Sequence, residues 1–103
     1  MTTNADGMST LEALFWTKWR GIPGVPLLVK YHCFDSVRQW RFDFAHRASR
    51  VAVEMEDEIE KGLEKYNAAT FQGWTIIRLN QRLTTYDTLI ALKWLIESRS
   101  PKR

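Results

Sequence analysis

The chain has 103 residues, a length that suits one compact domain and excludes two of ordinary size. Hydrophobic residues make up 45% and charged residues 26%, the composition of a folded globular protein rather than a disordered one. No apolar run approaches the ~18–20 residues of a transmembrane helix, and the start MTTNADGMST lacks the features of a secretory signal. The lone Cys33 excludes an internal disulfide and a cysteine-based zinc site. We therefore expect a single-domain cytoplasmic protein without a membrane partner.

The net charge is +3, but the acidic residues are unevenly distributed along the chain. Six of the twelve lie within residues 54–64, so the remainder is distinctly basic. A basic body suits a polyanion such as nucleic acid. The acidic stretch has two interpretations: it begins a helix, where acids complement the helix dipole, or part of it holds a cation.

The N-terminal third predicts a tail, a helix and a strand. Residues 1–8 are small and polar and are expected to be a disordered tail. A helix capped by Thr10 then follows, and the Gly- and Pro-rich segment 21–26 ends it. Residues 27–34 are rich in strand-forming side chains.

The rest of the chain predicts two more strands, a helix, a strand and a final helix. Segments 39–45 and 50–56 alternate as strands do, and Trp40, Phe42 and Phe44 share one face. The next helix is expected over 57–72, with an inner stripe of Ile59, Leu63, Tyr66 and Thr70 and with Gly73 closing it. A strand at 74–79 and a helix from Thr84 or Thr85 to about Ser98 follow, before a tail at 99–103. The order predicts an α/β domain with a mixed central sheet flanked by helices.

Two acidic residues come together if the alternating strands pair across the turn between them. With Ala45 facing Arg50, Asp43 and Glu54 become diagonal neighbours, with β-carbons about 7–8 Å apart. That separation suits two carboxylates that share one ion, and Mg²⁺ commonly takes one or two protein carboxylates. Glu56 lies on the same face. Acidic residues are disfavoured inside strands, and departures from propensity tend to mark functional sites.

Four segments together resemble the PD-(D/E)XK nuclease superfamily: WRFDF at 40–44, VAVEME at 51–56, EKYNAAT at 64–70 and GWTIIR at 73–78. They are similar in particular to small phage and bacterial nucleases of the Holliday-junction-resolvase and very-short-patch-repair type. The resemblance covers about residues 10–98 and implies a restriction-endonuclease-like αβββαβα core.

The resemblance also implies a site that holds Mg²⁺ or Mn²⁺ and hydrolyses DNA. Asp43 resembles the first metal-binding Asp of the motif and Glu54 its second acid, while Glu56 occupies the place of the motif Lys. The remaining implied groups are the backbone carbonyl of Met55 as a further ligand, Glu12 as a first-helix ligand, and Lys65 or Lys61 as the replacement cation. The loop after the E-x-E segment is shorter than in many relatives.

We expect branched DNA such as a Holliday junction to be the substrate, because the chain has no recognisable base-reading domain. Backbone phosphates position DNA without reading its sequence. The residues expected to contact DNA are Lys18, Arg20, Arg38, Arg41, Arg47, Arg50, Lys61 and Asn67. Paired cuts at a junction suggest a two-fold homodimer.

The final helix is expected to form the dimer interface. Leu89, Leu92 and Ile96 make one apolar ridge, and Tyr86, Ile90 and Trp94 make a second. Together they cover more than the ~100° stripe that packing on one core requires. Alternatively, both ridges bury within the monomer.

Each of these assignments has a structural alternative. Asp43 and Glu54 could form a salt-bridged surface with Arg41 and Arg50, Glu56 and Glu12 could be first-turn helix acids, and the two lysines could pair with acids of their own helix. The corresponding functional alternatives are a non-catalytic nucleic-acid-binding module, a nicking or repair endonuclease that acts on duplex DNA, and a protein-interaction domain.

Overall fold

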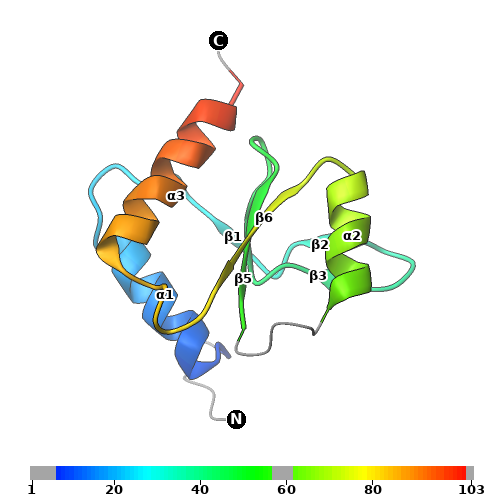
Figure 1. Ribbon diagram of the computed structural model, residues 1–103, viewed down its shortest axis with the longest axis horizontal. Helices are drawn as coiled ribbons and strands as arrows, with labels where there is room; N and C mark the ends of the chain where they lie inside the picture. Colours follow the sequence, from blue (N-terminus) through cyan, green and yellow to red (C-terminus); the bar gives the residue numbers. More distant parts are fainter. Residues whose placement is uncertain (1–6, 57–61, 102–103) are drawn as a thin grey trace.

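The computed structural model describes residues 7–56 and 62–101. These residues form an α/β domain (Figure 1). Its elements in chain order are α1 (Thr10–Arg20), β1 (Val29–Lys30), β2 (Cys33–Asp35), β3 (Trp40–Arg41), β4 (Phe44–His46), β5 (Val51–Met55), α2 (Leu63–Phe71), β6 (Thr75–Leu79) and α3 (Tyr86–Arg99).

The central sheet has four strands in the order β1-β4-β5-β6, and β2 and β3 form a separate pair. The β1–β4 and β4–β5 pairs are antiparallel, whereas β5 and β6 are parallel. The predicted α/β domain with a mixed sheet flanked by helices is therefore confirmed. Among the described residues, no helix is long and apolar enough to cross a membrane.

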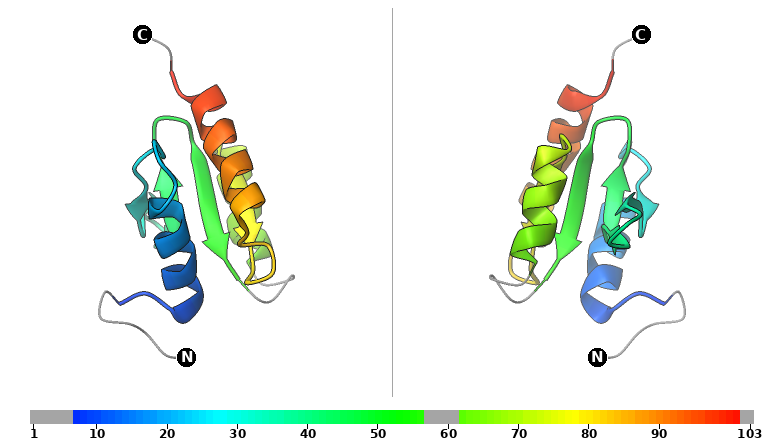
Figure 2. Two further views of the ribbon diagram at one scale, coloured as in Figure 1. Left: turned by 90° about the vertical axis from the view of Figure 1, so that its left-hand side faces the viewer. Right: turned by 90° about the vertical axis from the view of Figure 1, so that its right-hand side faces the viewer.

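Helices α1 and α3 cover one face of the sheet (Figures 1 and 2). The main apolar cluster fills the space between these helices and the sheet. It includes Phe15 and Trp19 from α1, Phe44 from β4 and Val53 from β5. The first ridge of α3 completes it, since Leu89, Leu92 and Ile96 are at most 3% exposed. The core therefore lies between these two helices and the sheet.

The opposite face carries α2 and the β2–β3 pair (Figure 2). A smaller cluster there joins Phe42, Ala45, Ala52, Ala69 and Trp74. Ring centroids of Phe42 and Trp74 lie 4.8 Å apart. Both faces of β5 are therefore covered, which explains why the strand is buried along most of its length.

The start of α1 differs from the prediction. Ser9, not Thr10, is the N-cap: its side chain accepts from the Glu12 amide, and the Glu12 side chain accepts from the Ser9 amide. This capping box satisfies two N–H groups that the helix itself cannot pair. Met8, which was expected in a disordered tail, is 2% exposed and joins the main cluster.

Two strands that the sequence predicted as continuous are each broken. Residues 27–34 divide at Tyr31, whose φ of 58° is left-handed, and residues 39–45 divide around Asp43. The prediction that Phe42 and Phe44 share one face was wrong, because Phe44 lies in the main cluster and Phe42 in the smaller one. A regular strand would point both rings to one side, so the break lets neighbouring aromatics fill both layers.

The predicted register across the β4–β5 turn was also wrong, by two residues. Ala45 pairs with Ala52 and Phe44 with Val53, rather than Ala45 with Arg50. The turn residues 47–50 stay outside the ladder. Arg50 has a φ of 56° there, and its amide donates to the carbonyl of Arg47.

Within the described residues, helix α2 begins at Leu63, whereas the sequence predicted a start at about residue 57. Its N-cap is Gly62, with a φ of 86°, and residues 57–61, with Ile59 and Lys61, lie outside the described part. Two members of the predicted inner stripe are exposed, since Leu63 is 58% exposed and Thr70 faces solvent. The helix turns Ala69 inward instead. Gly73 follows the helix in the left-handed conformation, as predicted.

Helix α3 begins as predicted and presents its second ridge to solvent. Thr85 is its N-cap, with its side chain accepting from the Thr88 amide. Tyr86 and Trp94 are 64% and 65% exposed, whereas Ile90 packs partly against the main cluster. The alternative in which both ridges bury within the monomer therefore fails for the two aromatic residues.

Candidate active site

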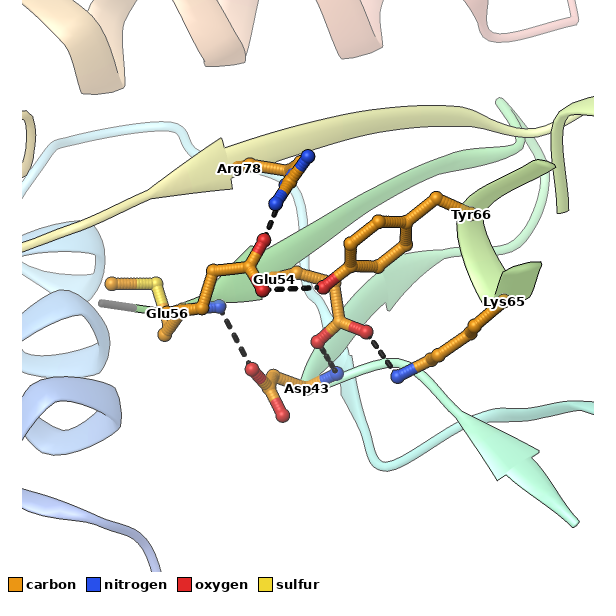
Figure 3. A network of polar contacts seen from close by, with 7 residues as sticks. Asp43, Glu54, Glu56, Lys65, Tyr66 and Arg78 are labelled. Carbon is orange, nitrogen blue, oxygen red and sulfur yellow. Dashed lines mark hydrogen bonds and ion pairs between the residues drawn. The ribbon is translucent and has the colours of Figure 1, made fainter. Parts of the chain in front are cut away.

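Asp43 and Glu54 lie opposite each other at the ends of two adjacent strands (Figure 3). Phe44 pairs with Val53, so the next position outward brings Asp43 to Glu54. The Asp43 amide donates to Oε2 of Glu54 at 3.3 Å, and the Met55 amide donates to Oδ2 of Asp43 at 2.8 Å. Each carboxylate is therefore held by the backbone of the other strand. The two-residue change of register converts the predicted diagonal pair into a directly opposed one.

The surroundings of Asp43 oppose its ionisation. Burial, followed by the negative charge of Glu54, raises the pKa of the Asp43 carboxyl from 3.8 to about 8. The amide hydrogen bond from Met55 acts in the opposite direction, and the carboxyl of Glu12 adds to the rise. Two neighbouring carboxylates are both ionised only at a large cost unless a positive charge offsets them. This point of the molecule therefore requires a proton or a cation near neutral pH.

Lys65 brings one positive charge to the pair from α2. Its Nζ forms an ion pair with Oε1 of Glu54. The Glu54 side chain is 5% exposed and that of Lys65 is 22% exposed, so the contact lies largely out of water. The structure thus unites Asp43, Glu54 and Lys65. It does not form the alternative salt-bridged surface, because Arg41 donates to the Tyr31 carbonyl and Arg50 to the Gln72 carbonyl.

Glu56 lies just beyond the end of β5 and is held by two other protein groups (Figure 3). Its Oε1 forms an ion pair with Nε of Arg78, and its Oε2 accepts a 2.8 Å hydrogen bond from the Tyr66 hydroxyl. The Arg78 guanidinium also lies 4.6 Å from the centroid of the Tyr66 ring. Burial and the nearby carboxylates raise the pKa of that hydroxyl, so it keeps the proton that it donates. The first-turn acid of α2 is Glu64 rather than Glu56.

Glu12 approaches the carboxylate pair from the first turn of α1. In addition to its capping contacts, its Oε1 accepts a 3.3 Å hydrogen bond from the Tyr31 hydroxyl. The Tyr31 amide in turn donates to the carbonyl of Asp43 at 3.1 Å. The strained backbone at Tyr31 therefore links α1 to the site, and Glu12 is a half-buried neighbour of Asp43 rather than an exposed first-turn acid.

A pocket of about 640 Å³ opens beside these groups. Asp43, Glu54 and Lys65 contribute its polar side. Its other lining residues are Trp40, Met55, Glu56, Gly62, Leu63, Glu64 and Tyr66. The volume lies within the usual range for ligand pockets, so the carboxylate pair borders a space large enough for a substrate group.

The described residues that were expected to contact DNA lie in four parts of the molecule. Arg38 and Arg41 lie on the β2–β3 hairpin, and the Arg38 guanidinium lies 4.8 Å from the ring centroid of the pocket residue Trp40. Arg47 and Arg50 lie in the β4–β5 turn, at the other end of β5 from Glu54.

Four further positions complete this set. Lys18 and Arg20 occupy the last turn of α1, where Lys18 donates to the carbonyl of Thr84. Asn67 is exposed on α2, and Lys61 lies outside the described residues. The structure therefore brings Arg38 beside a pocket residue and leaves the α1 and β4–β5-turn cations away from the pocket.

The residues present fit a divalent cation. Within the described parts of the chain, no group of three or more His, Cys, Asp or Glu side chains has the geometry to hold a metal ion. Mg²⁺ needs fewer, because it commonly binds one or two carboxylates and keeps several waters. Asp43 and Glu54 provide two adjacent carboxylates, and the charge of Glu54 helps to raise the pKa of Asp43.

Comparisons with protein-family models, with curated proteins and with solved structures found no match for this chain. The interpretation of the site therefore depends on its own geometry.

Sequence reasoning missed Tyr66 and Arg78 as members of the site. Tyr66 was expected only as a core-facing helix residue, whereas its hydroxyl binds Glu56. Arg78 is the single charged residue in the segment WTIIRL, which is otherwise apolar except for Thr75. A charge in a strand of that kind needs a partner, and this was the signal that could have identified it.

Proposed function

We propose that this protein is an endonuclease that hydrolyses DNA phosphodiester bonds and depends on a divalent metal ion. The observation that carries the proposal is the opposed carboxylate pair of Asp43 and Glu54, with the ammonium group of Lys65 beside it in an open pocket. These are the side-chain types of the PD-(D/E)XK nucleases that the sequence resembles. Here the lysine comes from α2, and Glu56 stands at the motif position where the lysine usually lies.

Each residue of the site would have its own role in the proposed reaction. Asp43 and Glu54 would hold Mg²⁺ or Mn²⁺, next to the backbone of Met55. When bound, such an ion acidifies a water molecule and offsets negative charge on the phosphate. Lys65 would stabilise the charge that develops on the phosphate oxygens, because a fixed cation in a partly desolvated site acts most strongly where charge develops. Glu12 would contribute to the negative field around the ion.

Branched DNA is the substrate class that we favour. The described cations that we expect to contact DNA lie on the hairpin, on the turn between β4 and β5, and at the end of α1, an arrangement suited to DNA arms that leave in different directions. Contacts of this kind position the phosphate backbone without reading bases.

A symmetric dimer would provide the paired cuts that a four-way junction requires. Tyr86 and Trp94 are large apolar residues exposed on α3. Exposed apolar patches of this kind often mark protein interfaces. A two-fold axis through this face of α3 would relate two copies of the Asp43–Glu54 site.

Incubation with three DNA substrates tests the proposal directly. Linear duplex, single-stranded and four-way-junction DNA are each incubated with Mg²⁺, with Mn²⁺ and with EDTA. We expect metal-dependent cleavage that is fastest for the junction. Faster cleavage of linear duplex would instead assign a nicking or repair activity, and no cleavage of any substrate with either metal would refute the nuclease proposal.

One observation favours a second candidate function, a non-catalytic nucleic-acid-binding module. The ammonium group of Lys65 pairs with Glu54, so this carboxylate already has a cationic partner within the chain, as expected of a nuclease fold that has lost its activity. This candidate predicts DNA binding that weakens with salt and does not change when EDTA is added.

A further inference from the structure

The contacts of Glu56 join three separate elements of the fold. The carboxylate stands at the end of β5, Arg78 belongs to β6, and Tyr66 belongs to α2. The Glu56 amide also donates to the carbonyl of Leu79 at 2.8 Å, which holds the backbone of Glu56 on β6. We call Glu56, Tyr66 and Arg78 the polar clamp (Figure 3).

Apolar packing holds α2 mainly at its C-terminal half. Ala69 is the only fully buried residue within Leu63–Phe71, and the Trp74 amide donates to its carbonyl at 3.0 Å. Among the described residues, the N-terminal turn shows no comparable apolar anchor, because Leu63 is 58% exposed. The position of this turn matters for the site because Lys65 extends from it to Glu54.

The clamp residue Tyr66 supports the N-terminal turn in two ways. Its hydroxyl binds Glu56, and its ring packs so closely on Gly62 that a β-carbon there would lie 3.1 Å from Cε2. Gly62 is the N-cap and has no side chain with which to cap the helix. The Tyr66 ring thus lies between the helix start and the Arg78 guanidinium.

We propose that the polar clamp is a positioning device that holds the first turn of α2 so that Lys65 reaches Glu54. Glu56 is then a positioning residue rather than a metal ligand, since protein donors occupy both of its carboxylate oxygens. Glu56, at the motif position of the lysine, thus holds the start of α2, and α2 supplies Lys65 as the replacement cation. This inference gives a role to Glu56 within the proposed nuclease site and so builds on the proposed function.

Chemical acetylation of lysines, followed by mass spectrometry, tests the inference without any activity measurement. Lys93 is a matched internal control, because its side chain is 20% exposed and pairs with Glu97, compared with 22% for Lys65 paired with Glu54. In Glu56→Gln and in Tyr66→Phe, we expect acetylation of Lys65 to rise roughly threefold, the effect of losing a modest ion pair, and acetylation of Lys93 to stay unchanged. The control Glu97→Gln should give the reverse pattern.

Three results would overturn the inference. Unchanged acetylation of Lys65 in both variants would show that the clamp does not hold the lysine. Equal increases at Lys65 and Lys93 would show a general loosening of the fold. Weaker Mn²⁺ binding by Glu56→Gln, measured by calorimetry, without a change at Lys65 would make Glu56 a ligand.

Kinetics extends the test to the proposed reaction. For Tyr66→Phe we expect a lower kcat for DNA cleavage at an unchanged KM and unchanged Mn²⁺ affinity, because the variant displaces Lys65 but neither carboxylate. A kcat equal to that of the wild type would overturn the link to catalysis. If the wild-type protein cleaves no DNA, the proposed function fails, and the acetylation result still decides whether the clamp positions Lys65.

Discussion

The ammonium group of Lys65 on α2 pairs with the buried carboxylate of Glu54 on β5, 11 positions earlier in the chain. Glu54 also accepts a hydrogen bond from the amide of Asp43. One carboxylate therefore connects α2 to the backbone just before β4. Removing a partner from such a contact leaves a charge in a desolvated place. The site and the stability of the fold are therefore coupled.

Removing either acid should abolish cleavage while DNA binding persists. We expect Asp43→Asn and Glu54→Gln each to reduce the rate with Mg²⁺ at least about a hundredfold, because both carboxylates would hold the ion that activates the water. Binding to junction DNA should stay equal or become stronger, since neither variant removes a cation and Glu54→Gln removes a negative charge near phosphate. Gel-based cleavage and fluorescence-anisotropy binding measure the two effects. Variants that still cut at near wild-type rates would show that the metal site is elsewhere.

Stability should fall as pH rises, because Asp43 binds its proton more tightly in the folded state. Its pKa is about 8 in the fold against an ordinary 3.8, so between these values the folded chain holds a proton that the unfolded chain has released. Raising the pH through this window then favours unfolding. A tenfold change in acid dissociation is worth about 1.4 kcal/mol, and we expect a loss of about 1–3 kcal/mol between pH 5 and pH 8.

Urea unfolding in EDTA at pH 5 and pH 8 measures this loss. Asp43→Asn should flatten the pH dependence and be more stable than the wild type at pH 8. Mn²⁺ should also reduce the loss, because the cation replaces the proton between the carboxylates. A wild-type stability that is constant over the range would contradict the raised pKa of Asp43.

Replacing Lys65 should affect both turnover and stability. We expect Lys65→Met to lower the free energy of unfolding by about 1–3 kcal/mol in the absence of metal, since Glu54 is left buried without its cation. Turnover should fall with little change in Mn²⁺ affinity. Lys93→Met removes an ion pair on α3 in which the lysine is similarly exposed but the acid, Glu97, is 47% exposed. It serves as the control, with a cost below about 1 kcal/mol. Equal losses in the free energy of unfolding for the two variants would show that the Lys65–Glu54 ion pair stabilises the fold no more than an exposed pair does.

The exposed aromatic ridge of α3 should mediate dimerisation. Sedimentation equilibrium at micromolar concentration should give about twice the 12.1 kDa mass of the chain. Trp94→Glu should shift the protein to monomer without loss of stability, because Trp94 is 65% exposed. A wild-type sample that remains at 12.1 kDa would remove the dimer and, with it, the paired-cut scheme.

The sequence by itself determined the order of the elements and the identity of the opposed acids. Periodicity predicted α1, β5, β6 and α3, because each has a clear apolar face or a capping residue within a few positions. Asp43 and Glu54 were identifiable because acids are unfavourable in strands and therefore stand out. Lys65 was identifiable only as one of two candidate lysines, since spacing along a helix does not show where its first turn lies.

Only the tertiary structure decided the register and the partners of the charges. The break at Asp43 depends on two aromatic residues filling opposite layers, and it brings Asp43 directly opposite Glu54. The pairing of Glu56 with Tyr66 and Arg78 joins residues that are 10 and 22 positions apart in the chain. Alternation fixes which face a side chain occupies, whereas a two-residue slip of register preserves the faces and changes every partner. Packing of the two layers, a property of the whole fold, selects among these registers.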